Sequence, residues 1–288
     1  MDRFAYAIVL LSTCIFQFSF AQESDSLLVS NKQWKEKQLK PGIVWKQGHF
    51  DNLFKAEQEI NFIEIDLKKI KQPIRLAGLQ TGFKNTTTFA SEANALAAIN
   101  GAFFNTKTGG GTTLVRINKQ LINETVLKEG KSPKRSFRSN AALAFDTKKI
   151  VILKGDDRDS TWDKKIKMPN VMTCGPLLLH KSHRVYLDSN AFNNNRHPRS
   201  AIALTTEHKL ILITVDGRNA QAYGMSLIEL SNVLKWLKGK DALNLDGGGS
   251  TTLYIKDEGK NGIVNYPTDN KLFDHEGERA VANAILVL

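Results

Sequence analysis

Residues 241–253 hold the combination of side chains best suited to chemistry in this chain. Asp246 ends an apolar, strand-like run and is followed directly by three glycines and three hydroxyl residues, Gly247, Gly248, Gly249, Ser250, Thr251 and Thr252. Glycine adopts backbone angles closed to other residues, so the N–H groups of such a loop can turn toward one concavity and hold an anionic oxygen. A glycine-rich turn without a ligand is the structural alternative, because glycine clusters mark turns more often than sites.

Other segments also place small and polar residues directly after an apolar run. Residues 99–105, 174–177, 197–202, 215–218 and 278–283 contribute Asn100, Cys174, His197, Arg199, Asp216, Arg218 and Arg279. Two carboxylates suit glycosidic cleavage, in which one activates water or stabilises an oxocarbenium-like centre. Arginine forks match phosphate oxygens in bidentate geometry. Each residue also has a structural interpretation, since an Asp can cap a turn and an Arg can pair with a neighbouring Asp.

In this order and spacing the segments resemble the phosphodiester glycosidase family, over roughly residues 95–288. The family includes an enzyme of lysosomal targeting that removes N-acetylglucosamine from a sugar phosphodiester, and many exported bacterial proteins. Two positions depart from the family pattern, because Ala102 stands where a second glycine is usual and Ser200 where Thr is common. Neither change removes an ionisable group. The resemblance implies a hydrolase that releases a sugar from a glycosyl phosphodiester, and it leaves the sugar and the phosphate-bearing acceptor open.

The residue chemistry and the resemblance together predict the composition of the site. The candidate catalytic residues are Asn100, His197, Asp216 and Asp246. The candidate substrate- and phosphate-binding residues are Arg199, Arg218, Gly247, Gly248, Gly249, Ser250, Thr251 and Arg279. A phosphate monoester leaves far more readily than an alcohol, so charge stabilisation on the departing phosphate matters more than strong general-acid help. The division of roles between the two Asp residues stays open at this point.

Two other functions are compatible with the same residues. A metal-dependent phosphodiesterase would break P–O instead of C–O, with Asn100, Asp216 and Asp246 as oxygen ligands, so a divalent cation is a possible cofactor and no cofactor is certain. A non-catalytic envelope module could bind an anionic polymer through its basic surface. His180 and His183 have no matching carboxylate pattern that would make a metal site.

The elements that must position these residues read as strands and one strong helix. Alternating or apolar runs at residues 60–67, 141–145, 150–153, 201–205 and 210–215 predict strands. A capping box of Ser226 and Glu229 begins a helix with leucines on one face, and Gly239 ends it. We expect the strands before Asp216 and Asp246 to be parallel neighbours joined by this helix. The predicted fold is α+β, with a mixed β-sheet core and flanking helices in a single domain.

The first residues have the pattern of a secretory signal peptide. Residues 1–21 combine Arg3, an apolar run and a small residue, Ala21, before polar sequence. A retained anchor is the alternative, since the run approaches the length that spans a bilayer. Cys14 also sits in a partial lipoprotein box, but the apolar run continues beyond it, which favours plain cleavage. We expect residues 22–42 to be a polar lead-in segment, residues 43–288 to form the domain, and the protein to be exported, periplasmic or extracellular, with no stable membrane span after cleavage.

Charge and cysteine content limit the partners. The net charge of +11 favours an anionic partner, and export together with the lack of a nucleic-acid-binding signature favours a phosphate-bearing glycan over nucleic acid. The densest basic stretch, residues 128–138, is typical of a solvated loop. Signal cleavage would leave Cys174 as the only cysteine, and we expect it to be a small buried residue and not a nucleophile. The sequence does not indicate the oligomeric state.

Overall fold

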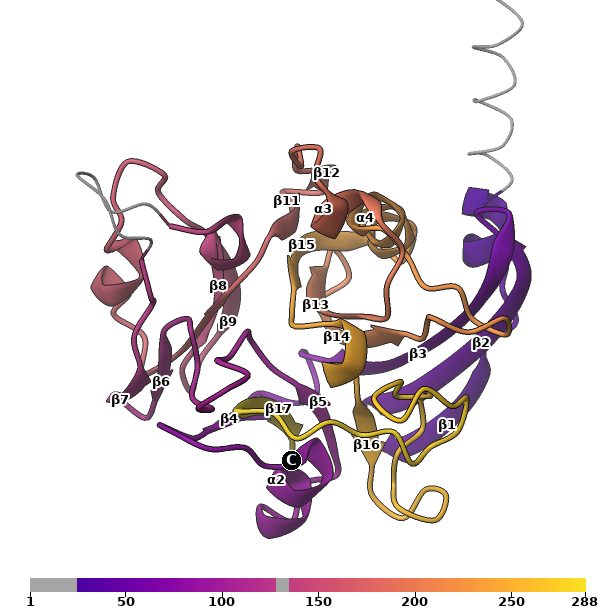
Figure 1. Ribbon diagram of the computed structural model, residues 1–288, viewed down its shortest axis with the longest axis horizontal. Helices are drawn as coiled ribbons and strands as arrows, with labels where there is room; N and C mark the ends of the chain where they lie inside the picture. The colour runs from indigo at the N-terminus through magenta and orange to yellow at the C-terminus, as the bar shows by residue number, and fades with distance from the viewer. Residues whose placement is uncertain (1–24, 128–134) are drawn as a thin grey trace, which may run out of the picture.

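The computed structural model describes residues 25–127 and 135–288, which form three antiparallel sheets and short helices (Figure 1). The signal peptide expected at residues 1–21 and the basic residues 128–134 lie outside the described part of the chain. The expected α+β class is confirmed, and every ladder between named strands is antiparallel. Among the described residues, none of the helices is long and apolar enough to cross a membrane.

The largest sheet has eight strands and carries most of the predicted site residues. Its order is β1 (Lys35–Lys40), β2 (Ile43–Leu53), β3 (Ala56–Asp66), β14 (Lys209–Val215), β13 (Arg199–Thr205), β15 (Gly239–Asn244), β11 (Leu177–His180) and β12 (His183–Arg184). The strand β1 falls within the expected lead-in segment and forms a largely exposed edge rich in Lys, which discourages further edge pairing.

Two smaller sheets complete the molecule. The five-stranded sheet has the order β7 (Gln120–Asn123), β6 (Val115–Ile117), β10 (Asn170–Cys174), β8 (Ala141–Phe145) and β9 (Ile150–Lys154). The four-stranded sheet has the order β16 (Leu253–Ile255), β5 (Ala97–Asn100), β17 (Asn283–Val287) and β4 (Ile74–Gly78). In Figure 1 the five-stranded sheet and strands β1–β3 lie on opposite sides of the central strands β13–β15.

The helices are short, and the strongest is the one expected from the sequence. Besides the helical residues 25–30, they are α2 (Thr86–Glu92), α3 (Ala191–Asn194), α4 (Leu227–Trp236) and the 3₁₀ turns η1 (Phe137–Ser139), η2 (Trp162–Lys165) and η3 (Gly248–Ser250). Helix α4 has both bonds of the capping box between Ser226 and Glu229. Its Leu227, Leu230 and Leu234 are fully buried against the eight-stranded sheet. The chain leaves the helix through Lys238 in a left-handed conformation (φ 63°), and Gly239 already begins β15.

The topology corrects one expectation about the central strands. Strands β14 and β15 run in the same direction, as expected, but they are not neighbours, because β13 lies between them and pairs antiparallel with both. A tight hairpin joins β13 to β14, so β13 takes the position beside β14. The chain then crosses over through helix α4, and β15 pairs with the other side of β13. Both strands still end at one edge of the sheet, and β13 begins there.

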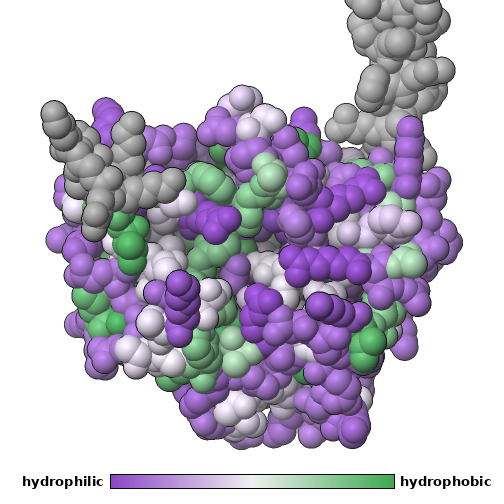
Figure 2. All heavy atoms as spheres, in the orientation of Figure 1, coloured by the Kyte–Doolittle hydropathy of each residue, from purple (hydrophilic) through white to green (hydrophobic). Residues whose placement is uncertain are grey.

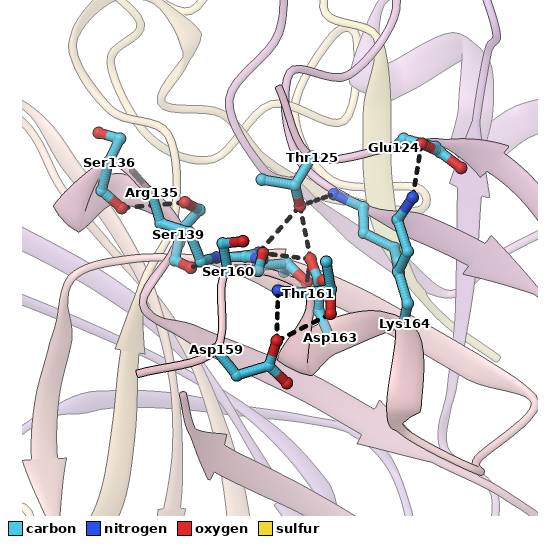
Figure 3. A network of polar contacts seen from close by, with 12 residues as sticks. Glu124, Thr125, Arg135, Ser136, Ser139, Asp159, Ser160, Thr161, Asp163 and Lys164 are labelled. Atoms are coloured by element: carbon cyan, nitrogen blue, oxygen red, sulfur yellow. Dashed lines mark hydrogen bonds and ion pairs between the residues drawn. The ribbon is translucent and has the colours of Figure 1, made fainter. Parts of the chain in front are cut away.

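A buried polar network stabilises the region beside the five-stranded sheet (Figure 3). Asp163 is 1% exposed, and its Oδ2 atom accepts from Arg135 Nη2 and the Thr125 hydroxyl. Arg135 also donates to the carbonyl oxygens of Ser139 and Ser160, at 3.1 and 2.6 Å. Its guanidinium lies 5.0 Å from the ring centre of Trp162. Arg135, which ends the basic stretch with Arg138, is therefore a structural residue of the core.

The surface on the side shown in Figure 2 is largely polar. Most of the face shown in Figure 2 is hydrophilic, with apolar residues in small groups. Such scattered apolar residues are normal for a protein surface, and the functional site must be sought from the geometry of the polar side chains.

Candidate active site

Strand β13 begins, and strands β14 and β15 end, on the same side of the eight-stranded sheet. This side, formed by strand ends, is the edge at which distant segments of the chain meet. Arg199 pairs with Val215, the residue before Asp216, and Ala201 pairs with Asn244, two residues before Asp246. The end of β5 joins the same edge through Asn100, whose amide donates to the Asp246 carbonyl oxygen at 2.7 Å. Antiparallel pairing across β13 thus supplies the convergence that the sequence suggested through adjacent parallel strands.

A cavity of about 480 Å³ opens at this edge. Its volume is within the usual range for small-molecule pockets. Seven residues predicted from the sequence line it, namely His197, Arg199, Arg218, Asp246, Gly247, Gly248 and Arg279. The rest of the wall is aromatic and hydroxyl-bearing, with Phe103, Phe104, Phe192, Thr106, Thr112, Thr113 and Ser136 among its residues. Five predicted residues do not line this cavity: Asn100, Asp216, Gly249, Ser250 and Thr251.

Asp246 is the carboxylate that faces the cavity. Its Oδ1 atom accepts from the Gly247 N–H at 3.0 Å. Burial is the largest influence on this group and raises its pKa to about 6. The hydroxyl of Ser250, which lies beside the carboxyl group without a hydrogen bond of good geometry, and the charge of Arg279 act in the opposite direction. Asp246 is therefore mostly ionised at pH 7 and becomes protonated in mild acid.

Asp216 is buried and does not line the cavity. Its hydrogen bonds connect separate segments of the chain. It is 0% exposed, and its Oδ1 atom accepts from the Asn265 amide at 2.8 Å and the Tyr266 N–H at 2.9 Å. Asn265 in turn donates to the Thr251 carbonyl oxygen at 3.1 Å. Burial raises the pKa of Asp216 to about 7, and its Oδ2 atom has no hydrogen-bond partner. Asp216 thus connects β14 to the end of the glycine loop.

Asn100 is also engaged within the protein. It is fully buried, and its Oδ1 atom accepts from the Ser200 hydroxyl at 2.7 Å and the Thr252 N–H at 3.2 Å. With its Nδ2 atom bound to the Asp246 carbonyl oxygen, the amide joins β5, β13 and both ends of the glycine loop. This arrangement fixes the backbone that carries Asp246.

The glycine loop does not form the N–H cradle that its sequence predicts. The Gly248 N–H donates to the Pro198 carbonyl oxygen at 2.8 Å, while the Ser250 and Thr251 N–H groups bond within the turn η3. The loop instead gives room to two guanidinium groups. A Cβ atom on Gly248 (φ 62°) would lie 3.0 Å from Arg218 Nη2, and one on Gly249 would lie 2.5 Å from Arg279 Nη2. A side chain at position 249 would therefore displace the Arg279–Asp269 pair, and the left-handed backbone favours glycine at position 248.

Arg218 and Arg279 differ in how far they are engaged. Arg279 forms an ion pair with Asp269, with Nε 2.8 Å from Oδ1. The Arg218 side chain is exposed and has no hydrogen bond or ion pair among the described residues. Its backbone is left-handed, with φ 65°, a conformation that costs about 1 kcal/mol or more for a non-glycine residue and concentrates at functional sites.

Arg199 is committed to the backbone. It is 1% exposed, and its Nε atom donates to the Met225 carbonyl oxygen at 2.8 Å. Its Nη2 atom donates to the carbonyl oxygens of Phe192 and Asn195 at 2.7 and 2.9 Å. The fork of Nε and Nη2 is thus not available for a phosphate, which moves the bidentate role expected of Arg199 to the two arginines over the glycine loop.

His197 and Arg138 complete the polar wall. Burial and the positive charges of Arg199 and Arg218 lower the pKa of His197, so the imidazole is neutral at pH 7 and can accept a proton. Arg138 was not among the site residues expected from the sequence, where it belonged to the basic stretch. Its guanidinium lies 4.5 Å from the ring centre of Phe192 and 5.2 Å from that of Phe103. The signal for it was an Arg beside Phe137, which alone is too common to be specific.

The donor set expected for a hard cation does not fit the geometry. The side-chain oxygen and nitrogen of Asn100 both form hydrogen bonds within the protein, and Asp216 does not line the cavity that Asp246 faces. Among residues 25–127 and 135–288, no three His, Cys, Asp or Glu side chains gather in a way that could hold a metal ion. Cys174 is fully buried, as expected, and burial raises the pKa of its thiol to about 12.

The family of the chain follows from comparison with known proteins. The model of the phosphodiester glycosidase family matches residues 93–288. Because this match covers well over half of the sequence, the chain belongs to the phosphodiester glycosidase family. The resemblance stated from the motifs is confirmed, with nearly the same boundaries.

Solved structures show the same fold. The chain aligns to a hypothetical protein from Synechocystis with a TM-score of 0.66 and 19% identity, covering 89% of this chain and 64% of that one. It aligns to the catalytic domain of zebrafish N-acetylglucosamine-1-phosphodiester alpha-N-acetylglucosaminidase, auto-inhibited by its pro-peptide, with a TM-score of 0.64 and 20% identity, covering 86% and 84%.

A curated relative shares a shorter segment. The SPbeta prophage-derived uncharacterized protein YomE of Bacillus subtilis (strain 168) is 28% identical over 108 residues, or 32% of this chain. The matched segment spans 17% of the length of that relative. The similarity therefore concerns a part of a much longer protein.

Proposed function

We propose that this chain is an exported hydrolase that releases a sugar from a glycosyl phosphodiester of an envelope or extracellular glycan. The observation that carries the proposal is the placement of Asp246 beside Arg218 and Arg279 in one cavity, across a glycine loop. A carboxylate is needed where positive charge develops on the sugar, and guanidinium groups are needed where negative charge develops on the phosphate. Family membership and the substrate in the name of the zebrafish enzyme support the same class of reaction.

The two arginines hold the phosphate in this proposal. Arg218 has an uncommitted guanidinium, and Arg279 can share its charge between Asp269 and a phosphate oxygen. Arg279 is already held by its ion pair with Asp269, so its guanidinium can stabilise the charge that builds on the leaving group with little reorganisation, whereas the exposed Arg218 becomes ordered when it binds the phosphate. The phosphate monoester then departs without a strong proton donor.

Asp246 and His197 act on the sugar side of the bond. The ionised Asp246 stabilises the oxocarbenium-like centre at C1 or attacks it, and the neutral His197 accepts a proton from water. Overall, the C1–O bond breaks, water adds its hydroxyl to C1, and the phosphate monoester takes the other proton. Asp216 and Asn100 are positioning residues, since their side chains bind the segments that carry Asp246 and Arg218.

Isotope-labelled water tests the bond that breaks. We expect the purified protein to hydrolyse a glycosyl phosphodiester in H₂¹⁸O and to place the label on the sugar, with activity unchanged by a chelator. Label on the phosphate together with loss of activity in chelator would establish the phosphodiesterase alternative. If the parent protein binds a set of glycosyl phosphodiesters with different sugars but hydrolyses none of them, the non-catalytic alternative is established.

Export is a second part of the proposal. Residues 1–21 are expected to be removed after Ala21, which leaves the lead-in segment, whose strand β1 pairs with β2, and the domain expected at residues 43–288. N-terminal sequencing of the protein recovered outside the cytoplasm should begin at Gln22. Recovery of the uncleaved chain in the cytoplasm, or a lipid-modified N-terminus at Cys14, would contradict plain cleavage.

A further inference from the structure

Two cavities meet at Arg218 and Arg279. The larger one contains Asp246, and the second, of about 290 Å³, is lined by Asn219, Thr268, Asp269, Lys271 and Leu272 in addition to the two arginines. The arginine pair is therefore a shared wall, with a cavity on each side. A phosphate held by this wall has two ester oxygens, and a diester extends from it in two directions.

The direction of the substrate follows from the position of the carboxylate. Asp246 lines the larger cavity and not the smaller one, so the C1 atom and its sugar belong in the larger cavity. The group esterified to the other side of the phosphate must then pass the arginines. The smaller cavity is the space that receives it.

The lining of the smaller cavity is suited to hydroxyl groups. Thr268 is 8% exposed, and its hydroxyl has no hydrogen-bond partner in the described structure. This hydroxyl is therefore free to form a hydrogen bond with a polar group in the cavity. Asp269, with its Oδ1 atom bound to Arg279, and Asn219 offer further polar groups. Leu272, which is 58% exposed, gives an apolar surface against which a sugar or polyol carbon face can pack.

We propose that the smaller cavity is the subsite for the group that leaves with the phosphate, and that this group is polyhydroxylated, a sugar or a polyol. This inference rests on the proposed function and deepens it. It assigns Thr268 and Leu272 to recognition of the leaving side, where they contact neither the sugar that is released nor the bond that breaks.

Two diesters of the same sugar 1-phosphate separate this subsite from the rest of the site. One carries a methyl group and the other a glycerol group on the far side of the phosphate. We expect the parent protein to hydrolyse the glycerol ester with the lower KM. Thr268→Val keeps the shape and removes the hydroxyl, so KM for the glycerol ester should rise about 5- to 10-fold, as expected for one hydrogen bond, with the methyl ester changed less than about twofold.

Leu272→Trp provides a second variant, because its exposed position does not endanger folding. The larger ring should obstruct the smaller cavity and raise KM for the glycerol ester by about 10-fold. Leu121→Trp is the matched control, since Leu121 is also an exposed Leu, 42% exposed, on β7. It should leave both substrates unchanged.

The results of these experiments distinguish a wrong subsite assignment from a wrong proposed function. If the parent hydrolyses both esters and the two variants alter them equally or not at all, the subsite assignment is overturned and the proposed function stands. If the parent hydrolyses neither ester, the proposed function is overturned and the subsite with it.

Discussion

Two regions of this protein combine arginine with a carboxylate, and they differ in how many hydrogen-bond donors of the arginine remain unused. In the Arg135–Asp163 network of Figure 3, the guanidinium donates to two carbonyl oxygens, a hydroxyl and a carboxylate, and it also lies over an indole ring. At the cavity, Arg218 has no such partner among the described residues, and Asp246 accepts one backbone N–H. A structural arginine is thus recognised by donors that are used within the protein, and a binding-site arginine by donors left unused.

The cost of building the two regions differs in the same way. The network uses ordinary backbone conformations around a fully enclosed Asp163, whereas the cavity requires left-handed residues at Arg218 and Gly248. The site therefore stores local strain that the surrounding sheet must hold, while the network contributes to the stability of that scaffold. The predictions below are arranged to separate these contributions, beginning with the largest.

Asp246→Asn should have the largest effect on turnover. We expect activity to fall on the order of 10³-fold, because the amide removes the charge at the reacting centre and keeps the shape. Activity of the parent should decline as pH falls through about 6, where Asp246 takes up its proton. Steady-state kinetics over pH 4–9, with a melting curve for each variant, measure both effects. Retention of parent activity by the variant would remove Asp246 from the mechanism.

Asp163→Ala should have the opposite profile. Removal of this partner leaves the Arg135 guanidinium buried without its counter-charge, which costs about 3 kcal/mol or more of stability. The turnover of the molecules that remain folded should stay close to that of the parent, because the network does not reach the reacting groups. Chemical denaturation and kinetics at low temperature provide the measurements. A large loss of turnover at full stability would break the distinction between the two regions.

Arg218→Asn tests the unpaired arginine. Asn tolerates the left-handed backbone at this position, so the change removes the guanidinium without the strain that Ala would add. We expect activity to fall about 10²-fold with a stability close to that of the parent. A substrate whose departing phosphate monoester has a lower pKa, such as a nitrophenyl phosphate ester, should recover part of the lost activity. An equal loss for good and poor leaving groups would assign Arg218 to another role.

Asp216→Asn should have the smallest effect on activity, within about threefold, because the amide oxygen can accept the same two bonds. The stability of the parent, in contrast, should depend on pH through the buried Asp216 carboxyl group. The unfolded chain releases the Asp216 proton near 3.8 and the folded protein near 7, so the stability of the parent falls as pH rises between these values. The variant should lose this slope and exceed the parent by about 4 kcal/mol at pH 8.

The control for this prediction is Asp216→Ala, which cannot accept either bond. It should lower both stability and activity, because Asn265 and the glycine-loop end lose their support. If Asp216→Asn is as inactive as Asp246→Asn, then Asp216 takes part in the reaction directly and is not a positioning residue.

Much of the fold could be predicted from local pattern. The hairpin of β8 and β9, the strands β13 and β14, and the capped helix α4 all follow from periodicity and turn residues within a few positions of each other. The order of strands could not, because the partner of a strand depends on which distant segment packs beside it. The insertion of β13 between β14 and β15 is such a case, and so is the pairing of β3 with β14.

The site was predictable as a set of residues more than as a set of roles. Strand-end motifs identified the seven predicted residues that line the cavity, because apolar runs fix where strands end. Local sequence does not show which acceptor a hydrogen-bond donor will meet in the folded protein. The three hydrogen bonds from Arg199 to backbone carbonyl groups therefore could not be predicted. The same limit made Arg135 and Arg138, three positions apart, look alike, although one is a core residue and the other lines the cavity.

The enclosure of Cys174 determines when an oxidant can reach its thiol. The folded protein, over its described residues, offers no accessible thiolate, because the only described thiol is fully buried and its pKa is about 12. An oxidant can therefore reach this sulfur only while the chain is unfolded. The packing of β10 into the core therefore ends the period during which this thiol can form mixed disulfides with other molecules.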